Sequence, residues 1–298
     1  MTEEIRPVAN NIILVAETGS DITKELAQEL GVILIPMHVA MGDQTLDDGA
    51  FPPEDVCAYY ERTGKIPTTS GSTVYDFESV YDQIFERDPN AQILHLAYSA
   101  VTTCSYHSSE LAIENKAYKD NVRLVDTKHV SVGQCAAVTA VAAWLKDHPE
   151  ATLDEAALAA EKICKKTRMC FVPENLNYLR AGGRCSNAAA LVGNLLQLHP
   201  CIEIIDGKLI ACKKYRGSAK KFAPSLLRDF DHKHALEREQ IYFIFTPYMD
   251  EAIRTALNDE AAAMGFRKIT WVKTGCVITC HGGPGAFGIV GTGGKEQI

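Results

Sequence analysis

The chain has 298 residues, of which 46% are hydrophobic and 23% charged, a composition typical of a soluble globular protein with one large domain or two ordinary ones. Its net charge of −8 argues against general nucleic-acid binding, which requires a basic face. No apolar run approaches the roughly 18 residues of a membrane span and the start has no signal-peptide pattern, so we expect a cytoplasmic protein.

The first half of the chain alternates between strand and helix patterns. Residues 11–16 form a continuous apolar run typical of a buried strand, residues 22–30 have helical spacing, and residues 32–38 form a second apolar run. This rhythm predicts a parallel α/β sheet, in which ligands collect at the carboxyl ends of strands. Further strands are expected at 92–97 and 122–125, and helices at 53–62, 74–87, from about 105 to 118, at 131–145 and from Thr152 to about 166.

Two segments rich in hydroxyl groups stand in this first half. Thr73 and Asp76 have the spacing of a capping box for the helix at 74–87, which leaves Thr68, Thr69 and Ser70 in the preceding loop without an obvious structural task. Ser99 follows the strand at 92–97, where strand gives way to helix. Loops rich in Ser and Thr are usually only loops, so this signal is weak by itself.

After residue 165 the pattern changes from alternation to hairpins and helices. Asp206-Gly207 lies between apolar runs at 201–205 and 209–213, which is a hairpin signature. We therefore predict two domains, an α/β domain over 1–165 and an α+β domain with a mostly antiparallel sheet over 166–298. The remaining predicted elements are strands at 168–172, 241–246, 268–273 and 276–279 and helices at 219–233 and 249–264.

The segment Gly182-Gly183-Arg184 predicts a sharp stop between two helices. Two glycines are suited to ending a helix in a left-handed conformation, and Ser186 or Asn187 can cap a following helix over 188–198. Arg184 beside a helix start would suit a carboxylate or phosphate. The alternative is a solvated turn residue without a ligand.

The candidate donors therefore fall on separate segments: Thr69, Ser70, Ser99, Arg184 and His281, the last within His281-Gly-Gly-Pro-Gly285. Together they would suit an anion held between the two domains. The chain lacks the phosphate-binding loop, the dinucleotide fingerprint and the nucleophile elbow. One alternative is an enzyme acting on a small carboxylate or acyl ester, with Ser99 as nucleophile and His281 as base, although no orienting carboxylate can be named.

The ten cysteines do not have the spacing of a metal or redox motif. Cys276, Cys280 and His281 are close in sequence, but a fourth ligand with suitable spacing is missing. We therefore predict no metal site. Free thiols in this number are typical of a reducing compartment.

Taken together and in order, the motifs resemble those of the DegV family of bacterial fatty-acid-binding proteins, over about residues 11–290. The resemblance implies a two-domain lipid carrier that is not an enzyme and needs no cofactor. The motifs that carry it are Ser-Asp-Ile-Thr, Ile-Pro-Met-His-Val, Pro-Thr-Thr-Ser, Val-Asp-Thr-Lys, Leu-Arg-Ala-Gly-Gly-Arg, Asp-Gly-Lys and His-Gly-Gly-Pro-Gly.

By the family pattern, Thr69, Ser99 and His281 would contact the carboxylate of a long-chain fatty acid whose acyl chain is buried in one domain. Arg184, with Ser70 and Gly282, would lie at the rim or contact a partner. An Arg–carboxylate clamp would tie up both carboxylate oxygens and so resist phosphorylation of the carboxylate. The partner implied is a fatty acid kinase that makes an acyl phosphate for phospholipid precursor metabolism. Lipid exchange would involve transient contact with a membrane surface. A regulatory module for another apolar ligand is a further alternative.

The chain departs from the family pattern at several positions. The family's usual Asp-Ser appears as Glu17-Thr18, and Gln-Pro after Thr-Thr-Ser appears as Gly71-Ser72. The segment Ser-Ser-x-Leu-Ser-Gly-Thr appears as Tyr98-Ser-Ala-Val-Thr-Thr-Cys104, and Gly-Gly-Arg-Ile as Gly-Gly-Arg-Cys185. These departures bear on the lining of the pocket.

Overall fold

The computed structural model describes residues 7–9, 11–174, 176–185 and 198–294. The first half of the chain forms a four-stranded sheet in the order β2-β1-β6-β7, in which every pair is parallel. The predicted parallel α/β architecture is therefore confirmed. The strands are β1 (Ile12–Glu17), β2 (Val32–Ile35), β6 (Gln92–Ala97) and β7 (Val122–Asp126).

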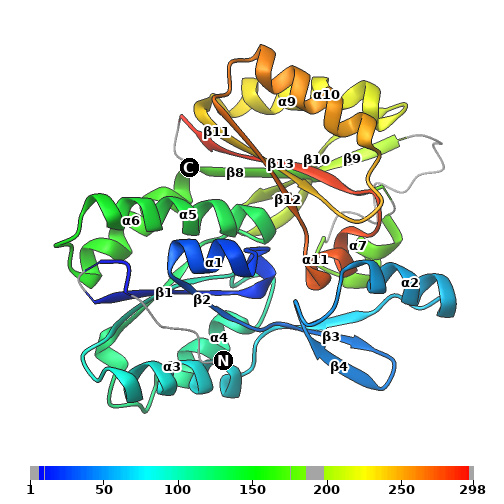
Figure 1. Ribbon diagram of the computed structural model, residues 1–298. Coiled ribbons are helices and arrows are strands. Elements are labelled where there is room, and N and C mark those ends of the chain that lie inside the picture. The colour runs from blue at the N-terminus through cyan, green and yellow to red at the C-terminus, as the bar shows by residue number, and fades with distance from the viewer. Residues whose placement is uncertain (1–6, 10, 175, 186–197, 295–298) are drawn as a thin grey trace.

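Helices cover both faces of this sheet, which explains why its strands are apolar throughout. Side chains alternate along β1: Leu14 packs with α1, α5 and α6, whereas Val15 packs with α3 and α4. The two helical layers lie above and below the sheet in Figure 1. The helices are α1 (Lys24–Leu30), α5 (Ser131–Asp147) and α6 (Leu153–Lys166) on one face, and α3 (Val74–Arg87) and α4 (Ser105–Ile113) on the other.

The second half forms a six-stranded sheet in the order β10-β9-β8-β13-β11-β12. All its pairs are antiparallel except β11–β12, as the mostly antiparallel prediction requires. The strands are β8 (Thr167–Val172), β9 (Leu198–Ile205), β10 (Lys208–Arg216), β11 (Leu236–Phe245), β12 (Lys268–Lys273) and β13 (Phe287–Gly293), the last of which the sequence pattern did not reveal.

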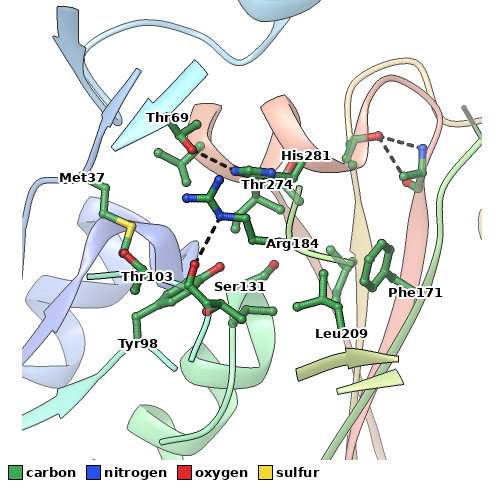
Figure 2. Close-up of a pocket in the computed structure, with 18 of the residues that line it drawn as sticks. Met37, Thr69, Tyr98, Thr103, Ser131, Phe171, Arg184, Leu209, Thr274 and His281 are labelled. Atoms are coloured by element: carbon green, nitrogen blue, oxygen red, sulfur yellow. Dashed lines mark hydrogen bonds between the residues drawn. The ribbon is translucent and has the colours of Figure 1, made fainter. Parts of the chain in front are cut away.

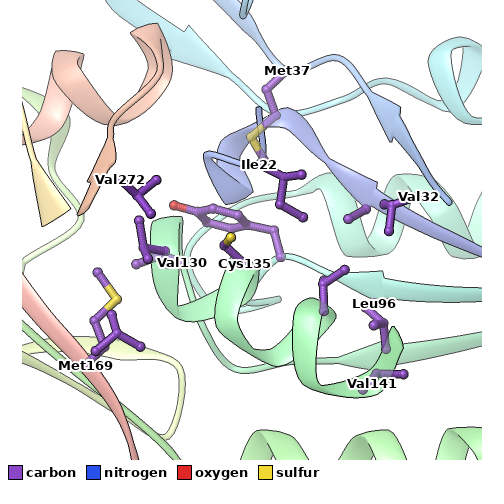
Figure 3. Close-up of a cluster of buried hydrophobic side chains, with 14 of the residues drawn as sticks. Ile22, Val32, Met37, Leu96, Val130, Cys135, Val141, Met169 and Val272 are labelled. Carbon is purple, nitrogen blue, oxygen red and sulfur yellow. The ribbon is translucent and has the colours of Figure 1, made fainter. Parts of the chain in front are cut away.

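One face of this second sheet is covered by its own helices, α9 (Ala219–His234) and α10 (Glu251–Ala263). The other face packs on α5 of the first half, so one apolar core joins the two halves. Figure 3 shows Cys135 and Val141 of α5 in this core, together with Met169 of β8 and Val272 of β12. The predicted division at residues 165 and 166 coincides with the end of α6, and the independence of the two domains stays a prediction.

A small third sheet, in the order β4-β3-β5, was not predicted. Its strand β5 (Thr68–Ser70) was expected to be a loop, and it pairs with β3 (His38–Met41), which also pairs with β4 (Gln44–Asp47). The isolated Thr-Thr-Ser segment has no strand pattern of its own, so only pairing with β3 reveals it. Helices α2 (Glu54–Thr63), α7 (Leu176–Gly182) and α11 (Cys276–Gly282) lie beside this sheet (Figure 1).

The strand predicted at 276–279 is wrong, because this segment begins the helix α11 (Cys276–Gly282). Carboxylates from the first half satisfy the backbone donors at its start. Asp48 Oδ1 accepts from the N–H groups of Cys276 (2.8 Å) and Val277 (3.3 Å), and Asp21 Oδ1 accepts from Gly275 (2.6 Å). These tertiary contacts override the strand propensity of a short run containing Val, Ile and Thr.

Other local predictions have different outcomes. The capping boxes of Thr73 with Asp76 and of Thr152 with Glu155 are both formed. The helix expected to reach about 118 ends at Ile113. The predicted helix at 188–198 and its caps Ser186 and Asn187 lie outside the described residues, apart from Leu198, which begins β9. None of the helices in the described part of the chain is both long and apolar enough to cross a membrane.

Candidate ligand-binding site

A cavity of about 80 Å³ lies between the two halves of the molecule. Its lining separates by chemistry: apolar side chains come mainly from the second half, and hydroxyl groups mainly from the first (Figure 2). The apolar part consists of Val130, Met169, Phe171, Leu209, Ile244, Val277, Ile278, Ala286 and Phe287, and the remaining part of Met37, Thr69, Ser70, Gly71, Tyr98, Thr102, Thr103, Ser131, Arg184, Thr246, Thr274, His281 and Gly282.

At the polar end, the structure brings Thr69 and His281 together. Thr69 Oγ1 of β5 and His281 Nε2 of α11 are 2.9 Å apart, although 212 positions separate them in sequence. Burial, and secondarily the charge of Arg184, lower the pKa of His281 to about 4. The imidazole is therefore neutral at pH 7. When it carries its proton on Nε2 it donates to Thr69, whose hydroxyl is then free to donate to a ligand oxygen.

The Gly-Gly-Arg motif fits directly around this histidine. A Cβ on Gly182 would lie 2.1 Å from His281 Nδ1, so only glycine allows α7 to pack against the ring. Gly183 has φ +66° and turns the chain after α7, as the two glycines predicted. Nδ1 of His281 is buried and has no hydrogen-bond partner among the described residues.

Arg184 lies at the exposed edge of the cavity and lines it. Its Nη1 donates to the carbonyl of Gly182 (2.7 Å) and its Nε to the carbonyl of Thr102 (3.3 Å), which hold the guanidinium over the pocket. Its Nη2 makes no hydrogen bond to any residue that the structure describes. Ser70 and Gly282, which were predicted with Arg184 for the rim, also line the cavity.

Ser99 is not brought to this site. It is fully buried, and its hydroxyl donates to the carbonyl of Gly207 (2.9 Å) in the turn between β9 and β10. It is not among the described residues that line the cavity. The nucleophile–base pair of Ser99 and His281 is therefore not assembled, because each side chain has a different partner. Ser99 instead connects the two halves, next to the ion pair of Lys128 and Asp206 (2.5 Å).

Sequence reasoning did not single out two acidic residues behind the site, Asp21 and Asp48. Both are buried, and together they hold the start of α11. Burial raises the pKa of Asp21 to about 8, against the hydrogen bonds from Ser131 and Gly275 that lower it. Burial also raises the pKa of Asp48. The signal in sequence was slight, since Asp21 resembles an ordinary helix cap.

Tyr98 was noted only as a departure from the family pattern, and the structure places it in the cavity wall. Its backbone N–H donates to Glu17 Oε2 (2.9 Å), which fixes the position of the residue after β6. Glu17 itself is fully buried. Burial alone would raise its pKa, but His95 and the hydrogen bonds from Gln134 and Tyr98 lower it on balance.

Comparisons with known proteins cover almost the whole chain. A family model described as "Uncharacterised protein, DegV family" matches residues 11–292. A DegV domain-containing protein of Deinococcus radiodurans is 27% identical over 94% of this chain and 97% of its own. A protein of Thermotoga maritima named fatty acid-binding protein is 28% identical over 92% and 95%. The solved structure "Fatty Acid Binding of a DegV family Protein from Thermus thermophilus" has a TM-score of 0.84 and 28% identity, covering 95% of this chain and 99% of that one.

The substitution Gly182→Ala should displace the His281 ring. The new Cβ would have to occupy space 2.1 Å from Nδ1, so we expect the bond to Thr69 to be lost and the free energy of unfolding to fall by about 1–3 kcal/mol. The ¹⁵N shifts of the His281 ring report the change. Gly183→Asn is the matched control, because its Cβ meets nothing within 4 Å and Asn tolerates a left-handed backbone. Unchanged ring shifts in Gly182→Ala would contradict this account.

The free energy of unfolding should fall as the pH drops from about 6.5 to 4. The unfolded chain binds a proton at His281 in this range whereas the folded chain does not, because the folded pKa is lowered to about 4. Each such histidine contributes a slope of up to about 1.4 kcal/mol per pH unit. His129, which is also lowered to about 4 by burial, adds a second contribution.

Urea unfolding at pH 7 and pH 4.5 measures this effect. We expect His281→Gln to reduce the pH dependence relative to the unsubstituted chain, and His232→Gln, an exposed residue on α9, to leave it unchanged. An identical pH dependence in His281→Gln would show that the imidazole is not held neutral by burial.

Proposed function

Since the chain belongs to the DegV family, we propose that it binds a long-chain fatty acid, burying the acyl chain in the cavity between its two halves. Two comparisons support this ligand: the related Thermotoga maritima protein is named a fatty acid-binding protein, and the Thermus thermophilus structure is titled for fatty acid binding. A binding protein rather than an enzyme is also the description that these relatives carry.

The observation that carries the proposal is the Thr69–His281 pair at the polar end of a cavity whose other part is apolar. Each methylene that enters the apolar part gains about 0.8 kcal/mol from burial. A carboxylate costs several kcal/mol to bury unless donors meet it. The Thr69 hydroxyl, with the neutral imidazole behind it, supplies such a donor without a buried charge.

The cavity has to widen for a long acyl chain. Its volume of about 80 Å³ is roughly half that of an engineered cavity that holds benzene. Met37 and Met169 line it, and their unbranched thioether side chains rearrange more easily than branched ones. We infer that these side chains move when the tail enters.

The enzyme alternative has less support in this geometry. A base for nucleophilic catalysis is normally oriented by a third group, and its pKa lies near the working pH. His281 has neither property, since its Nδ1 lacks a partner among the described residues and its pKa is about 4.

We further propose that the protein presents the carboxylate to a fatty acid kinase, which converts it to an acyl phosphate. The exposed guanidinium of Arg184 beside the polar end is the feature that favours this role. Two of its nitrogens bind the carbonyls of Gly182 and Thr102, and its Nη2, which bonds to no described residue, could meet a partner or a transferred phosphoryl group. As part of the same proposal, the protein is cytoplasmic and contacts a membrane surface transiently to exchange its lipid.

Denaturing extraction and mass spectrometry of protein purified from a bacterial host should reveal a bound fatty acid. Delipidated protein should bind palmitate, and Thr69→Val should weaken this binding about ten-fold or more through loss of a hydrogen bond to a charged group. Thr68→Val is the matched control, since Thr68 is the exposed neighbour in β5 and does not line the cavity. Protein that carries no lipid and takes up neither palmitate nor oleate would overturn the proposal.

Arg184→Ala separates the carrier role from ligand binding. We expect this variant to keep palmitate within about three-fold of the original affinity and to lose acyl-phosphate formation when a fatty acid kinase and ATP are added. Lys128→Ala, also an exposed cation near the junction of the halves, serves as the control. Loss of lipid binding in Arg184→Ala would instead make the guanidinium part of the carboxylate site.

A further inference from the structure

Tyr98 is held rigidly in the wall of the cavity. Its N–H is fixed by Glu17, and its ring lies so close to Gly19 that an added Cβ there would be 3.1 Å from Cε2. Only 8% of the residue is exposed, and it lines the cavity from the first half of the chain. The ring therefore packs closely against Gly19, directly after the end of β6.

The hydroxyl of Tyr98 has no hydrogen-bond partner in the described parts of the chain. Two other buried phenols do have one: Tyr81 bonds to His95 (2.8 Å) and Tyr215 to Asp229 (2.7 Å). Polar groups inside proteins are normally paired. A phenol that reaches a ligand cavity unpaired is therefore a donor available to the ligand.

The surroundings keep this hydroxyl protonated, so that it can donate a hydrogen bond. Burial raises the pKa of Tyr98 well above its usual value, Asp21 and Glu17 raise it further, and Arg184 opposes them. Asp21 does not repel an anion at pH 7, because its own raised pKa of about 8 keeps it mostly neutral. In Figure 2 the guanidinium of Arg184 lies between Tyr98 and the Thr69–His281 pair.

We propose that the Tyr98 hydroxyl donates a hydrogen bond to one oxygen of the ligand carboxylate while Thr69 donates to the other. Tyr98 thus takes the part that sequence reasoning gave to Ser99, whose hydroxyl is used by Gly207. The inference rests on the proposed function, since it assigns a residue to the same head group. It also makes the site selective for an ionised carboxylate over a neutral head group of the same chain length.

Binding of palmitate and of 1-hexadecanol to Tyr98→Phe tests this assignment. The variant keeps the ring against Gly19 and removes only the hydroxyl. We expect palmitate affinity to fall about ten-fold and hexadecanol affinity to change less than about three-fold. Tyr242→Phe is the control, because Tyr242 is equally buried in the same core but does not line the cavity.

A second measurement is independent of affinity. The carboxyl ¹³C shift of [1-¹³C]palmitate should differ between the unsubstituted protein and Tyr98→Phe, and should be the same in Tyr242→Phe. Equal palmitate affinity and an equal shift in Tyr98→Phe would overturn the assignment and leave the proposed function standing. Equal losses for palmitate and hexadecanol would also overturn it, since they would indicate packing. Failure of the unsubstituted protein to bind palmitate would overturn the proposed function itself.

Discussion

The site depends on the hydrogen bonds by which Asp21 and Asp48 hold the start of α11. These bonds cross from the first half of the chain to the second, and they fix the helix whose other end carries His281. They are formed at a cost, because both carboxyl groups are buried, their pKa values are raised, and Asp48 Oδ2 has no partner in the described structure. Removing the cap would leave backbone N–H groups unsatisfied in the interior, so the junction between the halves and the geometry of the cavity are coupled.

Around this helix, close packing explains a sequence motif that otherwise looks like a simple turn. Gly182 is required because the His281 ring fills the space where its side chain would be, and Gly183 supplies the left-handed turn that follows. The turn then directs Arg184 back across the cavity, where the carbonyl of Gly182 itself accepts from the guanidinium. Two glycines and one arginine therefore act together: the glycines allow α7 to pack against the His281 ring, and the turn brings the Arg184 guanidinium to the same cavity.

The groups that line the cavity suit binding of a ligand rather than its chemical conversion. In the proposed function the head group would meet neutral donors, and the only permanent charge at the polar end among the described lining residues is the exposed guanidinium of Arg184. A neutral imidazole that donates to the Thr69 hydroxyl leaves that hydroxyl free to donate to an anion. The apolar lining beyond it provides a favourable environment for a chain of methylenes. A carrier needs this balance, because a site that bound the carboxylate with several buried charges would release it slowly.

The sequence by itself determined the parallel first sheet, the mostly antiparallel second sheet and both capping boxes, and it singled out Thr69, His281 and Arg184, which the structure places at one cavity. These signals are local: apolar periodicity, cap spacing and short motifs depend on residues near one another in the chain. Only the tertiary structure decided that 276–279 is helical, that Thr68–Ser70 is a strand, and that Ser99 faces Gly207 while Tyr98 faces the cavity. The physical reason is distance along the chain, since the caps of α11 lie more than 200 positions upstream and β5 exists only through its pairing with β3.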